Sequence, residues 1–276
     1  MNYVTAHLQK PTPWSHLYAD DIVLVAETSQ QVQIDLTAWC TVLESRGLRV
    51  SRTKTEYMHC NFSGIRTSNI SVAQPQLDGT PLKQVDHFKY LGSTLASTAS
   101  VDIDIKDRIT AAWLKWRSLT GVICDAKMPI KVKGNVYKRE IRPVLIYGSE
   151  CWAMRKSDEQ QIHVTEMKML RWSGGVTLKD KVRNEYVRGT FKVANITDKL
   201  RENRLRWYGH VMRRGEDHMT RLVMEIEQPR RRPGRPPTTW MGTISKDMGT
   251  TDLEPELTQQ RPEWRKRIRG AERNGT

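Results

Sequence analysis

The stretch that decides the fold is "LYADD", Leu17 to Asp21, which is followed by "IVLVAE". Apolar residues on both sides predict two short strands, so Asp20 and Asp21 are expected at the tip of a hairpin. Adjacent aspartates repel each other unless a cation lies nearby, and a hard divalent cation such as Mg²⁺ prefers oxygen ligands of this kind. In two-metal phosphoryl transfer, carboxylates hold ions about 3.5–4 Å apart. The alternative is a solvated Asp-Asp turn, which the dipeptide alone favours.

The composition indicates a basic chain with a polyanionic partner. Its 276 residues carry 45 Lys and Arg against 31 Asp and Glu, a net charge of +14. Each phosphate that such a surface neutralises releases counterions, so the excess favours a nucleic acid, and a basic solvated surface is the alternative. The hydrophobic share of 38% is enough for a core. The length allows one large domain or two ordinary ones.

The cysteines point to a reducing compartment. Cys40, Cys60, Cys124 and Cys151 are far apart and form no C-x-x-C pair. This spacing argues against a structural zinc and against a disulfide framework. The first sixteen residues lack the apolar core of a signal peptide, and no stretch approaches the roughly 18 apolar residues of a membrane span. We therefore expect an intracellular protein, cytoplasmic or nuclear, without membrane attachment.

The periodicity of apolar residues changes near residue 100 and predicts an α+β chain. Before that point we expect the hairpin, a helix whose N-terminus has capping-box spacing at Thr28 and Gln31, and a tight turn at Asp78-Gly79. After it the spacing is helical, with helices expected over about 101–119, from Pro129 to Pro143, from Ser157, and over about 196–213.

The last part of the chain is the most basic. The Pro- and Arg-rich stretch "QPRRRPGRPPTTW" at 228–240 cannot hold a regular helix or strand, and positive charge is more than twice as dense after Lys199 as before it. The residues from Glu254 onward are polar, so a disordered tail is expected. The predicted regions are 1–100, 101–228 and 229–276.

Several stretches together resemble one family. "LYADDIVLVAE" resembles the Y-x-D-D hairpin of reverse transcriptases, in the Y-A-D-D form of the non-LTR (LINE-like) retrotransposon class. In the same order, "TAWCTVLESRGLRVSRTKTEYM" resembles the helix and the G-L…K-T segment that follow in that family, and "FKYLGSTL" resembles its primer-grip hairpin. Stretches that resemble its thumb and C-terminal parts are "RPVLIYGSECWAM", "MKMLRWSGGV", "RLRWYGHVMRR" and "RRRPGRPPTTW". The resemblance runs from about Trp14 to Trp240.

This resemblance implies a partial polymerase palm at 1–100, a thumb-like helical region at 101–228 and a basic tail at 229–276. It implies an RNA-directed DNA polymerase that binds RNA and DNA as primer-template and uses Mg²⁺. Asp20 matches the metal-binding aspartate and Asp21 its less essential neighbour. Lys54 matches the lysine proposed as general acid, although by itself it reads as a surface lysine. Residues that would contact the primer are Tyr18, Tyr90, Leu91 and Gly92, of which the last three could equally form only a β-turn.

The family's polymerase also requires an upstream metal-binding aspartate and a fingers region. Only sixteen residues precede Leu17, and they contain no Asp or Glu. We therefore expect the isolated chain to be catalytically incompetent unless an upstream polymerase segment acts in trans. The alternative function is a non-catalytic basic nucleic-acid-binding module. A third possibility is an unselected gene fragment.

The basic and aromatic residues allow more than one interpretation. The tryptophans of the helical region could stack on unpaired bases, although their spacing favours core packing. "RLRWYGHVMRR" suits contacts to a nucleic-acid backbone or a solvated helix face. "RRRPGRPP" resembles an AT-hook core with an inserted proline, and a nuclear-import patch or a flexible linker fits equally well. The residues predicted to bind nucleic acid are Arg213, Arg214, Arg230, Arg231, Arg232 and Arg235.

Overall fold

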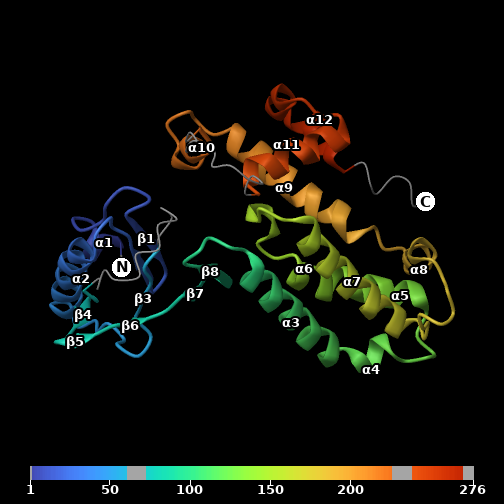
Figure 1. Cartoon of the computed structure of the whole chain (residues 1–276), viewed down its shortest axis with the longest axis horizontal. Coiled ribbons are helices and arrows are strands. Elements are labelled where there is room, and N and C mark those ends of the chain that lie inside the picture. Colours follow the sequence, from blue (N-terminus) through green and yellow to red (C-terminus); the bar gives the residue numbers. More distant parts are fainter. Residues whose placement is uncertain (1, 61–72, 226–237, 270–276) are drawn as a thin grey trace, which may run out of the picture. The chain divides into compact units, whose positions relative to one another are not determined.

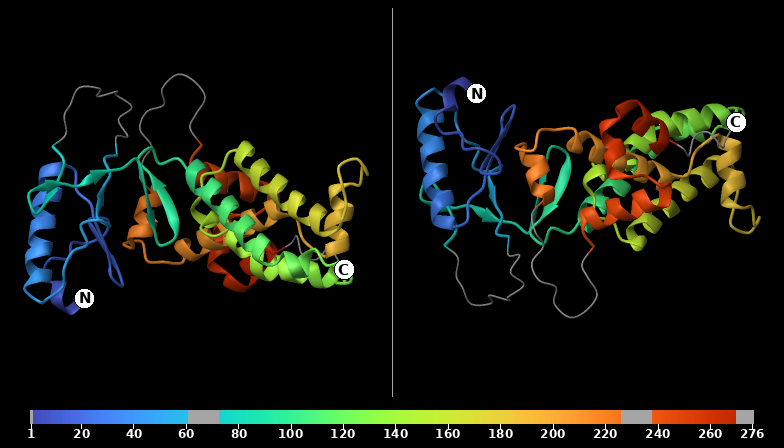
Figure 2. Two further views of the ribbon diagram at one scale, coloured as in Figure 1. Left: turned by 90° about the horizontal axis from the view of Figure 1, so that it is seen from below. Right: turned by 90° about the horizontal axis from the view of Figure 1, so that it is seen from above.

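The computed structural model describes residues 2–60, 73–225 and 238–269 and divides the chain into two compact units, Met1–Ser100 and Val101–Thr276. The elements are coloured along the chain in Figure 1, and two further views are given in Figure 2. Short sheets in the first unit and helices in the second agree with the predicted α+β class. The predicted nucleic-acid-binding residues Arg230, Arg231, Arg232 and Arg235 lie outside the described residues.

The first unit consists of one long helix and four two-stranded sheets among its described residues. Its elements are α1 (Asn2–Thr5), β1 (Ser15–Tyr18), β2 (Asp21–Leu24), α2 (Ser29–Glu44), β3 (Glu56–Tyr57), β4 (Gln76–Leu77), β5 (Thr80–Pro81), β6 (Lys83–Gln84), β7 (His87–Tyr90) and β8 (Ser93–Ala96). Strands β1–β2, β4–β5 and β7–β8 pair as antiparallel hairpins, and β3 and β6 pair in parallel.

Helix α2 organises the small core of this unit. The predicted N-terminus is confirmed, because the Thr28 hydroxyl accepts a hydrogen bond of 3.2 Å from the Gln31 amide and so satisfies one of the free amides of the first turn. The apolar face of α2 packs with β3, β4 and the residue before β6. The buried residues of this core are Leu36, Tyr57, Leu77 and Leu82. The predicted turn at Asp78-Gly79 is also confirmed, with φ of +50° and +72°, which is the conformation of a two-residue hairpin turn.

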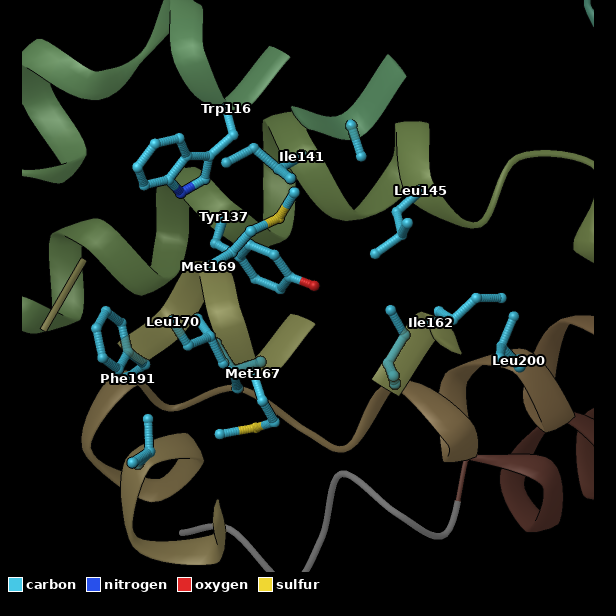
Figure 3. Packing of buried hydrophobic residues seen from close by; sticks show 14 of the residues in the cluster. Trp116, Tyr137, Ile141, Leu145, Ile162, Met167, Met169, Leu170, Phe191 and Leu200 are labelled. Atoms are coloured by element: carbon cyan, nitrogen blue, oxygen red, sulfur yellow. The ribbon is translucent and has the colours of Figure 1, made fainter. Parts of the chain in front are cut away.

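The second unit is helical. Its elements are α3 (Asp102–Ser118), α4 (Thr120–Ile123), α5 (Ile130–Val136), η1 (Tyr137–Ile141), α6 (Arg142–Leu145), η2 (Ser149–Cys151), α7 (Lys156–Ser173), α8 (Asn184–Phe191), α9 (Ile196–Met212), α10 (Met219–Glu225), α11 (Trp240–Thr251), η3 (Pro255–Gln259) and α12 (Arg261–Ile268). Helix α3 packs against α6 and α7 (Figure 1). Figure 3 shows the core between these helices, where Tyr137, Ile141 and Met169 lie side by side.

A π-helical turn accommodates a proline in the middle of one helix. The helix that begins at Ile130 continues through η1 into α6, and the Arg142 amide donates to the Tyr137 carbonyl five residues earlier. Pro143 follows directly and has no amide to donate. Widening the turn before a proline lets the helix continue without a steric clash. The helix expected from Pro129 to Pro143 is therefore present, and it continues two residues past the proline, to Leu145.

A buried polar network lies inside the same core. The Tyr137 hydroxyl donates to Glu166 Oε1 at 3.0 Å, and Arg142 Nη2 lies 3.6 Å from the same oxygen. The Ile196 amide donates to Glu166 Oε2 at 3.3 Å. Burial raises the pKa of Glu166, and Arg142 lowers it. The network ties three helices of the core together, which favours a single packing arrangement.

The expectation of a disordered tail from Glu254 onward is wrong for residues 254–269. Helix α12 packs on α9, and Trp264 is only 1% exposed. Its indole Nε1 donates to the Leu205 carbonyl at 3.1 Å. A second buried cluster therefore joins α9, α11 and α12; its members are Leu205, Tyr208, Ile244, Leu253, Trp264 and Ile268.

A buried ion pair fixes α11 to α9. Arg204 is 1% exposed, and its Nε and Nη2 atoms lie 2.6 and 3.1 Å from the two carboxylate oxygens of Asp247. Such a bidentate pair offsets the cost of burying both charges. Glu159 lies 3.3 Å from Arg204, and Arg201 lies 3.9 Å from Asp247, so each charge has a second partner. Within the described residues, no helix has the length and apolarity needed to cross a membrane.

Candidate functional site

The predicted hairpin is present at the acidic pair. Strands β1 and β2 pair in antiparallel register, with Tyr18 opposite Asp21. Ala19 and Asp20 form the two-residue turn, and Ala19 has a φ of +52°. Asp20 thus lies in the turn, and Asp21 is the first residue of β2. Both carboxylates are exposed to solvent, so a ligand could reach them without any movement of the chain.

A second hairpin carries the residues expected to contact the primer. In β7–β8, Tyr90 lies opposite Ser93, and Leu91 and Gly92 form the turn with φ of +48° and +87°. Positive φ at both central residues defines a type I′ turn, which suits the twist of a hairpin. Leucine rarely adopts this conformation, so the structure exposes an apolar side chain at a position where glycine or asparagine is usual.

The two hairpins meet at one cavity. A cavity of about 540 Å³ is lined by Tyr18 of the first hairpin and by Tyr90 and Leu91 of the second. Tyr18 is 62% exposed. Burial raises the pKa of Tyr90, and the Asp21 carboxylate raises it further, which means that the Tyr90 hydroxyl lies within electrostatic range of the acidic pair. The structure therefore brings Tyr18 and Asp21 of the first hairpin close to Tyr90 and Leu91 of the second hairpin, which is far away in the sequence.

The N-terminal residues complete this cavity, and the sequence pattern did not identify them as site residues. The remaining lining residues are Gln9, Lys10, Pro11, Thr12, Ser15, His16 and Leu17. Lys10 is held in place by Asp35 of α2, with Nζ 2.6 Å from Oδ2. The sequence around Lys10 does not indicate that this lysine lines a cavity, because the residue that orients it, Asp35, is 25 residues away. A larger cavity of about 700 Å³ lies between α2 and the β4–β5 hairpin, and neither Asp20 nor Asp21 lines it.

Lys54 is not among the residues that line the cavity of the two hairpins. It is exposed in a turn whose amide donates to the Ser51 carbonyl at 3.1 Å. Among the described residues, no hydrogen bond or ion pair joins its side chain to Asp20 or Asp21. Its role as a general acid therefore stays a prediction.

The donor set can be compared with the needs of Mg²⁺. Asp20 and Asp21 offer carboxylate oxygens, which are the ligands this cation prefers, and Mg²⁺ commonly takes one or two carboxylates and completes its octahedron with water and substrate phosphates. Within the described part of the chain, no cluster of three or more His, Cys, Asp or Glu side chains is placed to hold a metal. The pair thus fits the chemistry of a magnesium ligand set and supplies the smaller part of the coordination sphere.

The predicted basic residues divide into paired and unpaired groups. Arg213 Nη1 donates to the Thr258 carbonyl at 2.8 Å, and Arg214 lies exposed at the end of α9 with Nη2 3.1 Å from His210 Nε2. Arg204 belongs to the buried pair with Asp247 and cannot contact a nucleic acid. Arg206 is 55% exposed and pairs with Glu202.

The tryptophans of the second unit are mostly structural, as the spacing predicted. Trp116 and Trp152 are buried, and the Trp152 indole donates to Asp104 at 2.8 Å. Trp172 is the exception, because it is 64% exposed while its ring lies 5.0 Å from that of Trp116. The helix expected from Ser157 begins one residue earlier, at Lys156: Arg155 is the N-cap of α7, and its amide donates to Asp158 Oδ2 at 2.8 Å.

Comparison with known proteins supports a relationship to reverse transcriptases. Residues 1–95 match the family model described as reverse transcriptase (RNA-dependent DNA polymerase). Over 266 residues, the chain is 27% identical to a putative uncharacterized transposon-derived protein of Caenorhabditis elegans. The alignment covers 90% of this chain and 92% of that protein. No solved structure matches. The family match ends one residue before the last residue of β8 and includes both hairpins of the site.

Proposed function

We propose that the chain is part of an RNA-directed DNA polymerase of a non-LTR retrotransposon. In this proposal, residues 1–100 form a partial palm, residues 101–228 are thumb-like, and residues 229–276 contribute a basic segment. The observation that carries it is the exposed Asp20–Asp21 pair at a hairpin turn, inside the segment that matches the reverse-transcriptase family. The non-LTR assignment rests on the Y-A-D-D form and on the later stretches named above.

The residues around the cavity take the following roles. Asp20 and Asp21 would hold Mg²⁺. When bound, Mg²⁺ would neutralise phosphate charge and acidify the primer 3′-hydroxyl. Tyr18 and Tyr90 present aromatic rings to the shared cavity, where they would position the primer end, and the Leu91–Gly92 turn would support its backbone. Lys54 would donate a proton to the leaving pyrophosphate.

The 276-residue chain is proposed to be inactive without a complementing segment. Two carboxylates in an exposed turn bind a divalent cation weakly, because the surrounding water screens their attraction for the cation and only two negative charges are present. A segment that adds a carboxylate and a basic surface for template and triphosphate would complete the site. RNA and DNA are the proposed substrates, and the complementing polymerase segment is the proposed protein partner.

Primer extension tests the polymerase assignment. An RNA template with a DNA primer, Mg²⁺ or Mn²⁺ and labelled nucleotides should give no product above an Asp20→Ala control when the chain is alone. Adding the fingers and upstream palm segment of a non-LTR reverse transcriptase should give synthesis that depends on Asp20. Synthesis that persists in Asp20→Ala, or no synthesis with any complementing segment, would contradict the assignment.

Manganese binding provides a test that does not depend on activity. Mn²⁺ should broaden the backbone amide resonances of residues 18–22 in the chain alone, with weak affinity. The matched control is Asp180→Asn, which removes an exposed carboxylate from a different turn; Asp180 accepts from the Thr177 amide at 2.6 Å. The proposed site is supported if Mn²⁺ no longer broadens the resonances of residues 18–22 in Asp20→Asn but still broadens them in Asp180→Asn. Equal broadening of these resonances in both variants refutes it.

A second candidate function is a non-catalytic nucleic-acid-binding module. The observation that favours it is the pair of exposed or partly exposed arginines at the end of α9, Arg213 and Arg214. The stretch that contains Arg230, Arg231, Arg232 and Arg235 follows them in the sequence after helix α10. Phosphate contacts by these residues would carry little base specificity. Binding that survives Asp20→Ala distinguishes this function from catalysis.

A further inference from the structure

The lysine and arginine side chains within helix α9 form ion pairs with carboxylates, whereas the two arginines that follow the helix have no such pair in the described part of the chain. Lys199, Arg201, Arg204 and Arg206 each form an ion pair, to Glu202, Asp198, Asp247 and Glu202 respectively. Within the described residues, Arg213 and Arg214 have no ion pair with a carboxylate, and neither does Arg261, the first residue of α12. Along α9, the cations without a carboxylate partner thus come directly after its last residue, Met212.

These three arginines lie close to one another. Arg214 Nη2 lies 3.1 Å from His210 Nε2, and because a guanidinium only donates, this imidazole nitrogen must be the acceptor. Burial lowers the pKa of His210, and Arg214, Arg213 and Arg261 lower it further, together with His218. Burial and then Arg261 likewise lower the pKa of Arg213. Arg213, Arg214 and Arg261 are therefore within electrostatic range of the same imidazole.

The helix dipoles explain only part of this arrangement. Arg213 and Arg214 follow the C-terminal turn of α9, where a cation is favourable. Arg261 begins α12, where the dipole and the free amides disfavour a cation and favour an anion. The Arg213 guanidinium is oriented by its bond to the Thr258 carbonyl in η3, next to α12. The fold thus brings together a cationic site that its own carboxylates do not neutralise.

An aromatic pair lies beside the cations. The rings of Trp207 and His210 stack with centroids 5.4 Å apart and planes 28° apart. Trp207 is partly exposed, and His210 is exposed. A flat aromatic pair next to guanidinium groups suits a ligand that has both phosphates and unpaired bases, because bases stack on the rings while phosphates bind the cations. An acidic peptide would neutralise the charge and leave the rings without a partner.

We propose that Trp207, His210, Arg213, Arg214 and Arg261, named here the α9–α12 surface, bind single-stranded nucleic acid. The phosphates lie on the three arginines, and one base stacks on the Trp207–His210 pair. This deepens the second candidate function, since it adds residues and a strand preference to it, and it is independent of the Asp20–Asp21 hairpin.

Fluorescence anisotropy with the full chain tests the proposal. The probe is a fluorescein-labelled single-stranded oligonucleotide of about 15 nucleotides, titrated at several salt concentrations. The test variant is Arg214→Glu with Arg261→Glu. The control is Arg117→Glu with Lys127→Glu, which makes the same change in net charge at exposed residues without ion pairs elsewhere in the second unit. Circular dichroism confirms that both variants are folded.

We expect the test variant to bind at least about tenfold more weakly than the control variant, with a salt dependence reduced by about 0.7 for each lost phosphate contact. Trp207→Leu, which keeps an apolar side chain, should weaken binding of the single strand about fivefold or more and leave binding of a duplex of the same length unchanged. Asp20→Ala should bind as the unaltered chain does, so failure of the polymerase assignment would leave this result intact.

Three results would overturn the proposal. The first is equal affinity of the test and control variants. The second is a Trp207→Leu variant that binds the single strand as well as the unaltered chain does. The third is capture of the chain by vesicles of phosphatidylcholine and phosphatidylserine that the test variant abolishes while oligonucleotide binding is unchanged, which would assign the surface to a membrane.

Discussion

Replacing Gly209 in α9 with alanine tests the packing of the C-terminal helices directly. Alanine in the interior of a helix normally stabilises it by about 1 kcal/mol relative to glycine. Here a Cβ at position 209 would meet the indole of Trp264, lying 2.8 Å from Cδ1 and closer still to Nε1. Carbon atoms in good contact are about 3.5–4.0 Å apart, so the ring must shift by about 1 Å.

The magnitude follows from three terms. Overpacking of a tight core costs about 1–3 kcal/mol. The shift also weakens the 3.1 Å hydrogen bond from Trp264 Nε1 to the Leu205 carbonyl, a loss of about 1 kcal/mol. The gain in helix propensity offsets about 1 kcal/mol. We therefore expect a net destabilisation of about 2 kcal/mol, which is about 4–8 °C in Tm for a unit of this size.

Differential scanning calorimetry of the full chain measures this change, with Gly249→Ala as the matched control. Gly249 lies near the end of α11, and a Cβ there meets no other atom within 4 Å. The control should leave the Tm of the second unit unchanged or raise it, whereas Gly209→Ala should lower it. If Gly209→Ala raises the Tm as the control does, Trp264 does not pack on α9, and the folded C-terminal region is refuted.

Three further results are expected. Arg204→Ala should destabilise the second unit by about 3 kcal/mol in chemical denaturation, because it removes the bidentate partner of the buried Asp247 and leaves only Arg201, whose Nε lies 3.9 Å from that carboxylate. Arg206→Ala should cost less than about 1 kcal/mol, because Arg206 is 55% exposed and its partner Glu202 keeps an ion pair with Lys199. Similar losses in the two variants would contradict the buried pair. Burial and then Arg188 lower the pKa of His163, so the unfolded state binds a proton on this imidazole more readily than the folded state does, and the stability of the fold should decrease as the pH drops below about 6.5. The Tm of His163→Gln should therefore decrease less between about pH 7 and pH 5 than the Tm of the unaltered chain. An identical decrease would refute the lowered pKa. Replacing Arg230, Arg231, Arg232 and Arg235 with alanine should weaken nucleic-acid binding by the same factor for all nucleic-acid sequences. It should also reduce the slope of log affinity against log salt concentration by about 0.7 per lost phosphate contact. Unaltered affinity and salt dependence would mean that this segment is only a linker.

The local features of the site could be predicted because each has a strong short-range signal. Adjacent aspartates between apolar runs predicted the β1–β2 hairpin, and Asp78-Gly79 predicted the β4–β5 turn. The cavity itself could not be predicted from spacing, because it depends on how Tyr90 is brought to Tyr18 and on contacts made by Lys10. Such contacts link residues that are distant in sequence and share no periodic pattern.

The C-terminal helices were missed for a different reason. Helix α12 buries only Trp264 and Ile268 among eight mostly charged residues, so composition is dominated by its solvent face. The same limit applies to the arginines: Arg204 and Arg214 look alike in "RLRWYGHVMRR", and only the position of Asp247, which is 43 residues from Arg204, makes one structural and leaves the other exposed.

The buried Arg204–Asp247 pair has a consequence for synthesis of the chain on the ribosome. When α9 is made, Arg204 can pair only with Glu159, and its bidentate partner Asp247 follows later in α11. The apolar face of α9 is covered fully only when Trp264, 59 residues beyond Leu205, has been made. At about 5–20 residues per second, this interval lasts roughly 3–12 s, during which α9 is exposed to chaperones and proteases. A copy of the gene with a stop codon before Trp264 would remove the indole that packs on Leu205 and Tyr208, so its product should be degraded even though every residue of the Y-A-D-D hairpin is intact.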